Sequence, residues 1–358
     1  MNKNYYAVIM AGGIGSRFWP MSTKQFPKQF HDILGTGTSL IQQTSKRFEQ
    51  IIPSENILIA THKDYQTLVK KHLPNIPTSN ILLEPAMRNT APCILYSALK
   101  IYNQNPDGIM IVAPSDHLIE NESAFIDNIK TSLKFCDDND VLVTLGIKPT
   151  FPNTGYGYIK YIDSEETIKK VNSFTEKPNL EKAQEFLNDG RYLWNAGIFV
   201  WSVKSILQQF QLNLPKMFAL FNSENSIYNT SLEVDFINTI YETSENISID
   251  FGIMEKATNV FVLPATFVWN DLGTWLSLYE NLEKDKNKNA TVGGQVIYNN
   301  ANNNIVRTQN HKKVVIQGLN DYIVIEENDI LLICPKNNEQ EIKTIREQVK
   351  NKFGDNFV

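Results

Sequence analysis

Up to about residue 147, short apolar runs alternate with amphipathic stretches. The segment from Tyr5 to Met10 is almost entirely apolar, which is typical of a strand buried on both faces of a sheet. Comparable runs predict further strands, at Ile57–Ala60, Ile81–Leu83, Ile109–Ala113 and Val141–Ile147. This half of the chain therefore predicts a mainly parallel sheet.

The stretches between these runs carry helix-start signals. Ser39 and Gln42 have the spacing of a capping box, and Asn89 precedes an amphipathic segment with Pro92 in its first turn. Strands that alternate with helices at this spacing form right-handed βαβ units, and such sheets bind ligands at the carboxyl ends of their strands. Three polar or glycine turns, at Gly12, Glu84 and Asp116, follow predicted strand ends.

The pattern changes after Lys148. We expect a strand at 155–161 with an antiparallel partner at 167–174, a helix at 181–188 that stops at Gly190, and a buried strand at 194–201. Residues 202–256 are predicted to be mostly helical, with a break at Pro215. Short strands follow at 260–264 and 266–269, and Thr274 can cap the next helix.

A polar stretch at 285–290 marks a predicted domain boundary. We expect a catalytic domain over residues 1–284 and a small β-rich domain over 285–358 that ends in a helix at 338–352. The short strands expected in the second domain are Val292–Tyr298, Asn304–Arg307, Val314–Gln317, Ile323–Glu326 and Ile330–Cys334.

Composition narrows the class of protein. A net charge of -5 and a pI near 5.7 argue against a nucleic-acid partner, which normally needs a basic surface. Three cysteines lie far apart, which favours buried apolar residues over a metal site or disulfides. No signal-peptide pattern or membrane-length apolar run is present, so we expect a cytoplasmic protein with no membrane partner.

The first predicted strand runs into a glycine-rich turn. Gly12, Gly13 and Gly15 allow a ligand to approach the backbone closely, and Arg17 and Lys28 supply positive charge. The turn lacks the third glycine of a dinucleotide fingerprint and the Gly-Lys-Ser/Thr of a P-loop. Alternatively, the glycines serve only to make a tight turn. The two cations favour a polyphosphate ligand instead.

Two aspartates follow predicted strands. Asp116 lies in the sequence PSDH, and Asp271 lies two residues before a glycine. Each alone could cap a turn. Two carboxylates from separate strand ends can hold one Mg²⁺, which takes its remaining ligands from phosphate and water. With Arg17 and Lys28 they predict a metal–polyphosphate site.

Two further polar positions have open interpretations. Glu176 and Lys177 precede a proline just after a strand, where a solvated surface turn is the commoner structure. Asn195 lies in an otherwise apolar strand, so its amide must be hydrogen-bonded either to protein or to a ligand.

Several segments of the chain match the motifs of one enzyme family. They are AGGIGSRFWP (11–20), FPKQF (26–30), EPAMRNTAP (84–92), PSDH (114–117), NTGYGYI (153–159), FTEKP (174–178), WNAGIF (194–199), SID (248–250) and WNDLG (269–273). They span nearly the whole chain in order. Through the first two segments the chain resembles the sugar nucleotidyltransferase family, and through the others it resembles, within that family, the mannose-1-phosphate guanylyltransferases.

The resemblance implies a fold and a reaction. The fold is α/β, with a Rossmann-like mixed, mainly parallel sheet flanked by helices, and a small C-terminal domain like a left-handed β-helix. The reaction converts GTP and α-D-mannose 1-phosphate to GDP-mannose and pyrophosphate with Mg²⁺. A homodimer is also implied.

The resemblance further implies roles for individual residues. The implied catalytic residues are Arg17, Lys28, Asp116 and Asp271, and the last two would hold Mg²⁺. The implied nucleotide-binding residues are Ala11, Gly12, Gly13, Gly15, Arg17, Glu84, Asn89 and Asp116. The implied sugar-phosphate residues are Gly155, Glu176, Lys177 and Asn195.

Three other functions are weighed against this one. A sister enzyme could use another nucleoside triphosphate or another hexose 1-phosphate. A non-catalytic nucleotide-binding relative is disfavoured because it would not need both Asp116 and Asp271. An NAD-dependent dehydrogenase is disfavoured by the missing third glycine and by the absence of an obvious ribose-binding acid.

Overall fold

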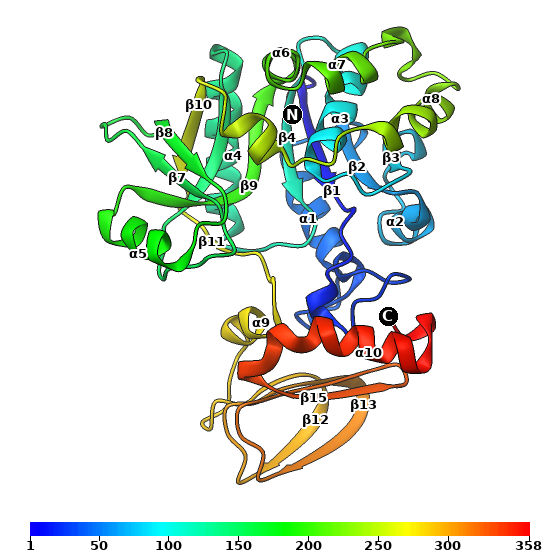
Figure 1. Cartoon of the computed structure of the whole chain (residues 1–358), viewed down its shortest axis with the longest axis vertical. Coiled ribbons are helices and arrows are strands. Elements are labelled where there is room, and N and C mark those ends of the chain that lie inside the picture. The colour runs from blue at the N-terminus through cyan, green and yellow to red at the C-terminus, as the bar shows by residue number, and fades with distance from the viewer. The chain divides into compact units, whose positions relative to one another are not determined.

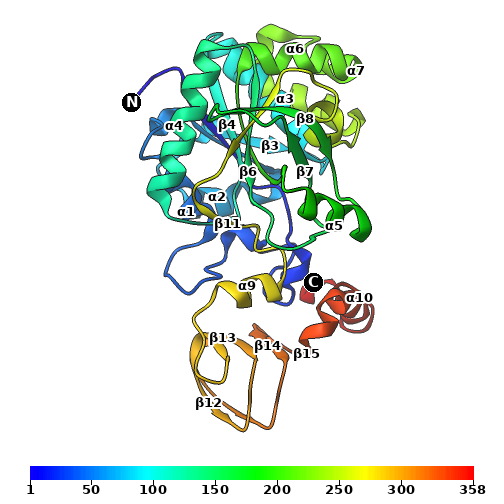
Figure 2. The same ribbon diagram turned by 90° about the vertical axis from the view of Figure 1, so that its left-hand side faces the viewer.

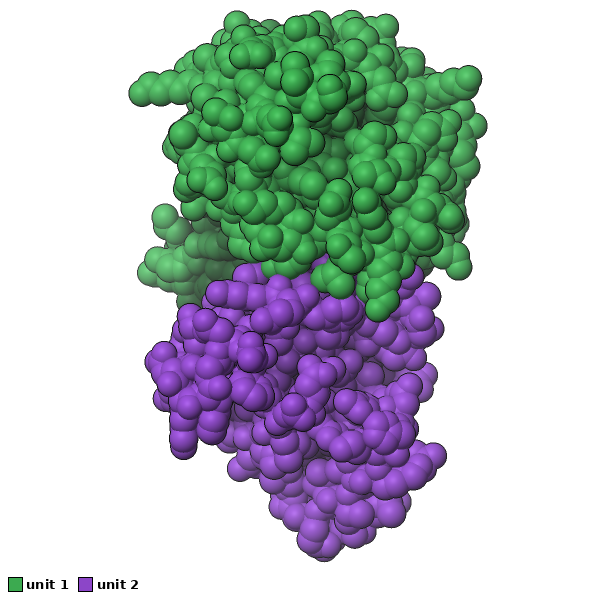
Figure 3. All heavy atoms as spheres, turned by 90° about the vertical axis from the view of Figure 1, so that its right-hand side faces the viewer, with its two compact units in different colours: residues 1–12, 44–115, 119–269 green, residues 13–43, 116–118, 270–358 purple.

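The chain folds into two units, each assembled from separate stretches of sequence. The computed structural model describes all 358 residues. Unit 1 comprises residues 1–12, 44–115 and 119–269, and unit 2 comprises residues 13–43, 116–118 and 270–358 (Figure 3). Units of this kind need not coincide with domains defined by sequence, so the expected boundary at 284/285 stays a prediction.

A nine-stranded sheet forms the centre of unit 1. Its strand order is β3-β2-β1-β4-β9-β6-β10-β8-β7. The strands are β1 (Tyr5–Met10), β2 (Ile57–His62), β3 (Ile81–Glu84), β4 (Ile109–Pro114), β6 (Leu142–Ile147), β7 (Tyr158–Tyr161), β8 (Lys169–Thr175), β9 (Tyr192–Ser202) and β10 (Val260–Pro264). The remaining short strands β5 (Leu118–Glu120) and β11 (Val268–Asn270) form a two-stranded sheet.

The large sheet is mixed. β1, β2, β3 and β4 are parallel, and β10 is parallel to β6, as the apolar runs predict. β9 runs antiparallel to both of its neighbours, β4 and β6, and β7 pairs antiparallel with β8 and β9. The predicted mixed, mainly parallel α/β fold is therefore confirmed.

Helices cover both faces of this sheet. α3 (Thr90–Gln104) and α6 (Val203–Asn213) pack on one face around a buried cluster that includes Val8, Met110 and Trp201. α4 (Glu122–Asp138) covers the opposite face (Figures 1 and 2). The other helices of unit 1 are α2 (Gln66–His72), α5 (Leu180–Asp189), α7 (Pro215–Phe221) and α8 (Glu233–Ile240), together with residues 44–48 of α1 (Leu40–Phe48).

The predicted helix starts are present. Asn89 accepts a hydrogen bond from the Thr90 backbone N–H at 3.1 Å, directly before α3. The Ser39 backbone N–H donates to the Gln42 side chain at 2.9 Å, directly before α1. These caps use N–H groups that a helix leaves unpaired, and they fix where each helix begins.

Unit 2 contains a four-stranded sheet with the order β12-β13-β14-β15. Its strands are β12 (Ala290–Asn299), β13 (Ile305–Gln317), β14 (Tyr322–Glu327) and β15 (Ile330–Pro335). β12, β13 and β14 are parallel despite short connections, which is how successive turns of a β-helix pair. The chain continues through a 3-10 helix (Lys336–Glu341) into α10 (Ile342–Phe353).

One strand prediction in this unit is wrong. The segments Asn304–Arg307 and Val314–Gln317 were expected as two strands, but both belong to the single strand β13. β13 pairs with β12 through Thr308↔Gly293 and resumes at Lys313↔Gln295, with a register shift between them. The polar residues between the two apolar runs therefore bulge from one strand rather than form a turn.

The glycine-rich turn and the C-terminal part of the chain share one core in unit 2. The rings of Phe18 and Trp275 lie 4.8 Å apart, at the start of α9 (Trp275–Asn281). The Trp19 indole N–H donates to the Phe357 carbonyl at 2.7 Å. Residues from the β12–β15 sheet and α10 complete the cluster, among them Ile305, Ile323, Leu332 and Ile342. Unit 2 therefore depends on residues from both ends of the chain.

Two predictions from composition can be compared with the structure. Cys93, Cys136 and Cys334 are buried free thiols, as expected. None of the helices has the length and apolar character needed to span a bilayer.

Candidate active site

The glycine-rich turn follows β1 and turns sharply at Gly15. Gly15 has a φ of 71°, in the left-handed region that glycine adopts without steric cost. A Cβ added at Gly15 would lie 2.5 Å from the Lys28 Cβ. The Lys28 backbone N–H also donates to the Ile14 carbonyl at 3.3 Å. Glycine at this position therefore lets the Lys28 segment pack directly on the turn.

The Lys28 ammonium group joins both predicted metal-binding aspartates. Its Nζ lies 2.9 Å from Asp116 Oδ2 and donates to the Asp271 main-chain oxygen at 2.9 Å. The Lys28 side chain is only 4% exposed, whereas that of Asp116 is 29% exposed. Burial favours a raised pKa for Asp116, but the charges of Lys28 and His117 outweigh it and lower the pKa. The Asp116 carboxylate is therefore ionised at neutral pH.

Arg17 lies on the short 3-10 helix at Ser16–Phe18 and is exposed. Phe18, the next residue, is buried in the unit 2 core and anchors this helix. A guanidinium held at its base and open to solvent at its tip is suited to bind a phosphate oxygen. Gly13, in the same turn, is also exposed, and a Cβ there would meet no atom within 4 Å.

The donor set around Lys28 fits Mg²⁺. Asp116 and Asp271 offer hard carboxylate oxygens, and Asp271 Oδ1 accepts the Gly273 backbone N–H at 3.0 Å, which fixes its side chain. No group of three or more His, Cys, Asp or Glu side chains is arranged to hold a metal ion alone. Mg²⁺ needs no such group, because it usually takes one or two carboxylates and completes its shell with phosphate and water.

In unit 1, Ala11, Gly12 and Glu84 lie at the carboxyl ends of β1 and β3, the two strands that flank β2. The Ala11 backbone is held between Ala60 and Thr61 of β2, at 2.7 and 2.9 Å. A Cβ on Gly12 would lie 3.1 Å from Glu84 Oε2, so the glycine leaves room for this carboxyl. The sheet therefore brings together these three predicted nucleotide-binding residues.

Glu84 is buried and accepts a hydrogen bond from the Tyr241 hydroxyl. Burial raises the pKa of Glu84 from 4.5 to about 7, although the Tyr241 hydrogen bond opposes the rise. Asn89 differs, because it is exposed, and its φ of 67° places it in a turn that few side chains tolerate. Its Oδ1 caps α3, and its amide N–H₂ points away from that cap.

Asn195 lies near the start of β9, opposite Gly146 at the end of β6. Its Oδ1 accepts from the Thr144 hydroxyl at 3.0 Å and from the Gly197 backbone N–H at 3.1 Å. Its Nδ2 donates to Asp250 Oδ1 at 2.8 Å. Protein groups therefore bind the amide oxygen and one amide N–H, and the second N–H remains for a ligand. Asn195 thus fits both interpretations of the sequence, the structural one and the ligand-binding one.

Glu176 follows β8 at the same edge of the sheet. Its side chain is 9% exposed and pairs with Lys177 Nζ at 2.8 Å, while the Lys177 side chain is 62% exposed. In this turn the Glu176 carboxyl is therefore mostly buried, whereas the Lys177 ammonium group is exposed to solvent. A Cβ on Gly157 would collide with Glu176 Oε2. Gly155, in the same loop, donates its backbone N–H to the Asn153 side chain at 2.7 Å.

Sequence reasoning missed three residues of this arrangement. Tyr241 holds Glu84, Thr144 holds Asn195, and Asp250 accepts from Asn195. Asp250 lies in the segment SID, which the sequence comparison noted without a role. Tyr241 and Thr144 gave no signal, because one lies in a helical region and the other in an ordinary buried strand.

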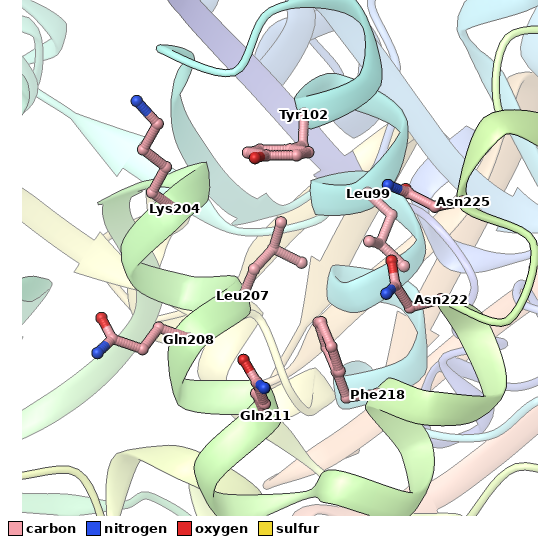
Figure 4. A pocket seen from close by; sticks show the side chains of 9 residues that line it. All are labelled: Leu99, Tyr102, Lys204, Leu207, Gln208, Gln211, Phe218, Asn222 and Asn225. Atoms are coloured by element: carbon pink, nitrogen blue, oxygen red, sulfur yellow. The ribbon is translucent and has the colours of Figure 1, made fainter.

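A separate pocket of unit 1 lies among α3, α6 and α7 (Figure 4). Its floor is apolar, with Leu99, Leu207 and Phe218, and amide side chains such as Gln208 and Asn222 stand around it. None of the residues predicted to bind substrate lines this pocket.

Comparison with known proteins agrees with the fold. Residues 6–288 match the family described as nucleotidyl transferase, and residues 294–349 match the MannoseP isomerase/GMP-like beta-helix domain. The chain is 36% identical over 355 residues to the alginate biosynthesis protein AlgA of Pseudomonas syringae pv. tomato, covering 95% of this chain and 72% of that protein. It is 33% identical over 357 residues to a mannose-1-phosphate guanylyltransferase of Escherichia coli, covering 96% and 75%.

A solved structure agrees as well. The protein described as mannose-1-phosphate geranyltransferase from Thermus thermophilus superposes with a TM-score of 0.88 at 28% identity, covering 97% of this chain and 99% of that one. The α/β sheet and the β-helix-like sheet together define a nucleotidyltransferase, an enzyme class. Within that class, the chain belongs to the mannose-1-phosphate guanylyltransferase family.

The contact between Gly15 and Lys28 generates a first prediction. Gly15→Ala should destabilise unit 2 by more than about 1 kcal/mol beyond the cost of a left-handed alanine, because the new Cβ overlaps Lys28. Gly37→Ala is the matched control, since Gly37 also has a positive φ, of 86°, but no atom within 4 Å of the added Cβ. Urea unfolding of both variants measures the difference, and equal destabilisation would show that the contact is unimportant.

The buried Glu84 generates a second prediction, on stability against pH. A carboxyl whose folded-state pKa is raised stabilises the fold below its unfolded pKa of 4.5, and this stability is lost as pH rises towards about 7. The Glu84→Gln side chain cannot titrate. The free energy of unfolding of this variant, relative to that of the wild type, should therefore be higher at pH 8 than at pH 5. Urea unfolding at both pH values measures this, with the exposed Glu55→Gln as control. Parallel pH profiles would contradict the assigned environment.

Proposed function

We propose that the protein transfers GMP from GTP to α-D-mannose 1-phosphate, giving GDP-mannose and pyrophosphate. The observation that supports this most directly is the buried Lys28 ammonium between Asp116 and Asp271, beside the glycine-rich turn. A triphosphate is bound by cationic groups, and its counter-ion is bound by carboxylates, so these residue types support the proposal. Relatives named as mannose-1-phosphate guanylyltransferases supply the choice of substrates.

This reaction needs positioning and charge neutralisation more than proton transfer. The attacking phosphate oxygen of the sugar phosphate is already ionised at neutral pH, and pyrophosphate is a competent leaving group. Backbone N–H groups around Gly12, Gly13 and Gly15 bind the phosphates, and Arg17 and Lys28 face the charge that grows on the leaving group. The in-line attack on the α-phosphorus then proceeds without a general base.

Asp116 and Asp271 would hold Mg²⁺ in this proposal. When bound there, the ion would supply positive charge that neutralises the phosphates. Lys28 keeps Asp116 ionised and therefore ready to bind the metal at neutral pH. Hydrogen bonding from the Gly273 backbone keeps the Asp271 carboxylate in one orientation.

The base and the sugar are assigned to unit 1. We assign guanine recognition to the Glu84–Asn89 segment, where Asn89 is exposed and Glu84 is buried and hydrogen-bonded to Tyr241. Asn195, Glu176 and the Gly155 backbone would contact the mannose hydroxyls, and the exposed Lys177 ammonium would contact the sugar phosphate. Formation of a homodimer stays a prediction from family resemblance.

A pyrophosphate-release assay with different substrates tests the assignment. The purified protein is incubated with GTP, ATP, UTP or dTTP and with mannose, glucose or galactose 1-phosphate, in the presence of Mg²⁺. GTP with mannose 1-phosphate should give the highest kcat/KM. If another pair is preferred, the assigned substrates are wrong but the protein is still a nucleotidyltransferase. If no pair releases pyrophosphate, a non-catalytic nucleotide-binding relative is favoured.

The two aspartates give a separate prediction. Asp116→Asn and Asp271→Asn should each lower kcat/KM by at least about 100-fold, because each removes an anionic ligand from the proposed metal site. The Mg²⁺ concentration that gives half-maximal rate should also rise. Asp329→Asn is the control, an exposed aspartate of the same unit. Thermal unfolding checks that the variants are folded, and near wild-type turnover in either variant would reject a shared metal site.

A further inference from the structure

The side-chain amide of Asn195 has one fixed orientation. The Gly197 backbone N–H can only donate, so the Asn195 atom that it contacts at 3.1 Å must be the oxygen. The Thr144 hydroxyl donates to the same oxygen at 3.0 Å, which occupies both of its lone pairs. The nitrogen then faces Asp250 Oδ1 at 2.8 Å. Only one polar group of Asn195 remains for a ligand, the second N–H of its amide.

Asp250 is itself held by the backbone that precedes it. The Ile249 N–H donates to the Thr90 hydroxyl at 2.9 Å, and the Ala91 N–H donates to the Ile247 carbonyl at 3.1 Å. Both bonds tie this segment to the first turn of α3, a helix in which residues 91–101 are all buried. The Asp250 carboxylate is thus a fixed acceptor rather than a mobile surface group.

The charge around Asp250 supports this arrangement. Burial raises the pKa of Asp250 to about 6, and the nearby Glu176 carboxylate adds to the rise, whereas Lys177 and the Asn195 hydrogen bond oppose it. Above that pH the Asp250 carboxylate is ionised and can only accept hydrogen bonds. Asn195 must therefore keep its nitrogen towards Asp250, and a flipped amide would place two oxygens against each other.

We propose that Asp250 is a positioning residue of the sugar subsite, which makes Asn195 present the sugar with one N–H donor and no acceptor. The proposal rests on the assignment of Asn195 and Glu176 to the sugar. A hydroxyl that accepts a hydrogen bond from Asn195 must give its own hydrogen to another group. The Glu176 carboxylate is the acceptor available, since a Cβ on Gly157 would collide with its Oε2, and the Asn195 backbone N–H donates to the Gly157 carbonyl at 2.8 Å. The pair therefore selects a sugar with a free hydroxyl at this point over its deoxy or O-methyl analogue.

Substitutions at Asp250 and at Asn195 test the proposal through the Michaelis constants of the two substrates. Asp250→Ala should raise KM for the sugar phosphate about tenfold and leave KM for the nucleotide within about twofold, because only the sugar contact is disturbed. Asp250→Asn can still accept from Asn195 through its amide oxygen, so it should recover most of this loss. Asp235→Ala, an exposed aspartate on α8, is the matched control.

A double-mutant cycle separates positioning from a general structural role. If Asp250 acts through Asn195, the double variant Asp250→Ala with Asn195→Ala should be no worse than Asn195→Ala alone. Thr144→Val provides a second route, because it removes one donor to the Asn195 oxygen with almost no change in shape. It should raise the same KM by a smaller factor, and it tests the proposal even if Asp250→Ala does not fold.

The outcomes distinguish this proposal from the proposed function. If the wild type prefers a sugar phosphate other than mannose 1-phosphate, the substrate assignment fails, and the same variants are then measured with the preferred sugar phosphate. Equal changes in KM for nucleotide and sugar, additive losses in the cycle, or an unchanged sugar KM in both Asp250→Ala and Thr144→Val would overturn the positioning role.

Discussion

A buried ammonium group must find oxygen atoms to replace water, because an unpaired charge in a protein interior costs several kcal/mol. Lys28 finds them at the Asp116 carboxylate and at the main-chain oxygen of Asp271. Three segments that are distant in sequence are therefore held at one point, and Gly15 leaves the space that lets the Lys28 stem approach. The same contact lowers the pKa of Asp116 and keeps a carboxylate charged beside it. One buried ion pair therefore both joins these segments and sets the charge of Asp116.

Two polar side chains of unit 1 are also paired, but with neutral and acidic groups instead of a lysine. Glu84 and Asn195 lie at the end of the sheet where its parallel strands finish. Each is hydrogen-bonded to a residue that the local sequence pattern does not predict as its partner. Tyr241 donates to one oxygen of Glu84, and Thr144, Gly197 and Asp250 together fix the amide of Asn195. A side chain restrained in this way loses little conformational entropy when a ligand arrives, which favours tight and selective binding. The conformational entropy of these side chains is lost during folding rather than when a ligand binds.

Much of the fold could be predicted from sequence, because its signals are local. The apolar runs gave β1 to β4, and Asn89 and Ser39 marked the starts of α3 and α1. β13 could not be predicted as one strand, because the polar residues between its two apolar parts resemble a turn, and only pairing with β12 shows that they bulge. For the site, the sequence named Lys28, Asp116 and Asp271 but not the contacts among them. Tyr241 and Thr144 were beyond reach, since their partners lie 157 and 51 residues away.

The hydrogen bond between Trp19 and Phe357 joins residues 338 positions apart. Phe18 and Trp19 continue the glycine-rich turn, and their core is completed by α9, the β12–β15 sheet and α10. During synthesis, β1 and the glycines leave the ribosome early, whereas Phe357, which accepts the Trp19 hydrogen bond, leaves it 338 residues after Trp19. A nascent chain can therefore build much of the unit 1 sheet while Phe18 and Trp19 still lack part of the core that packs against them. The β12–β15 sheet and α10 thus share the core that packs against Phe18 and Trp19, so a change in that sheet can reach the turn through this core.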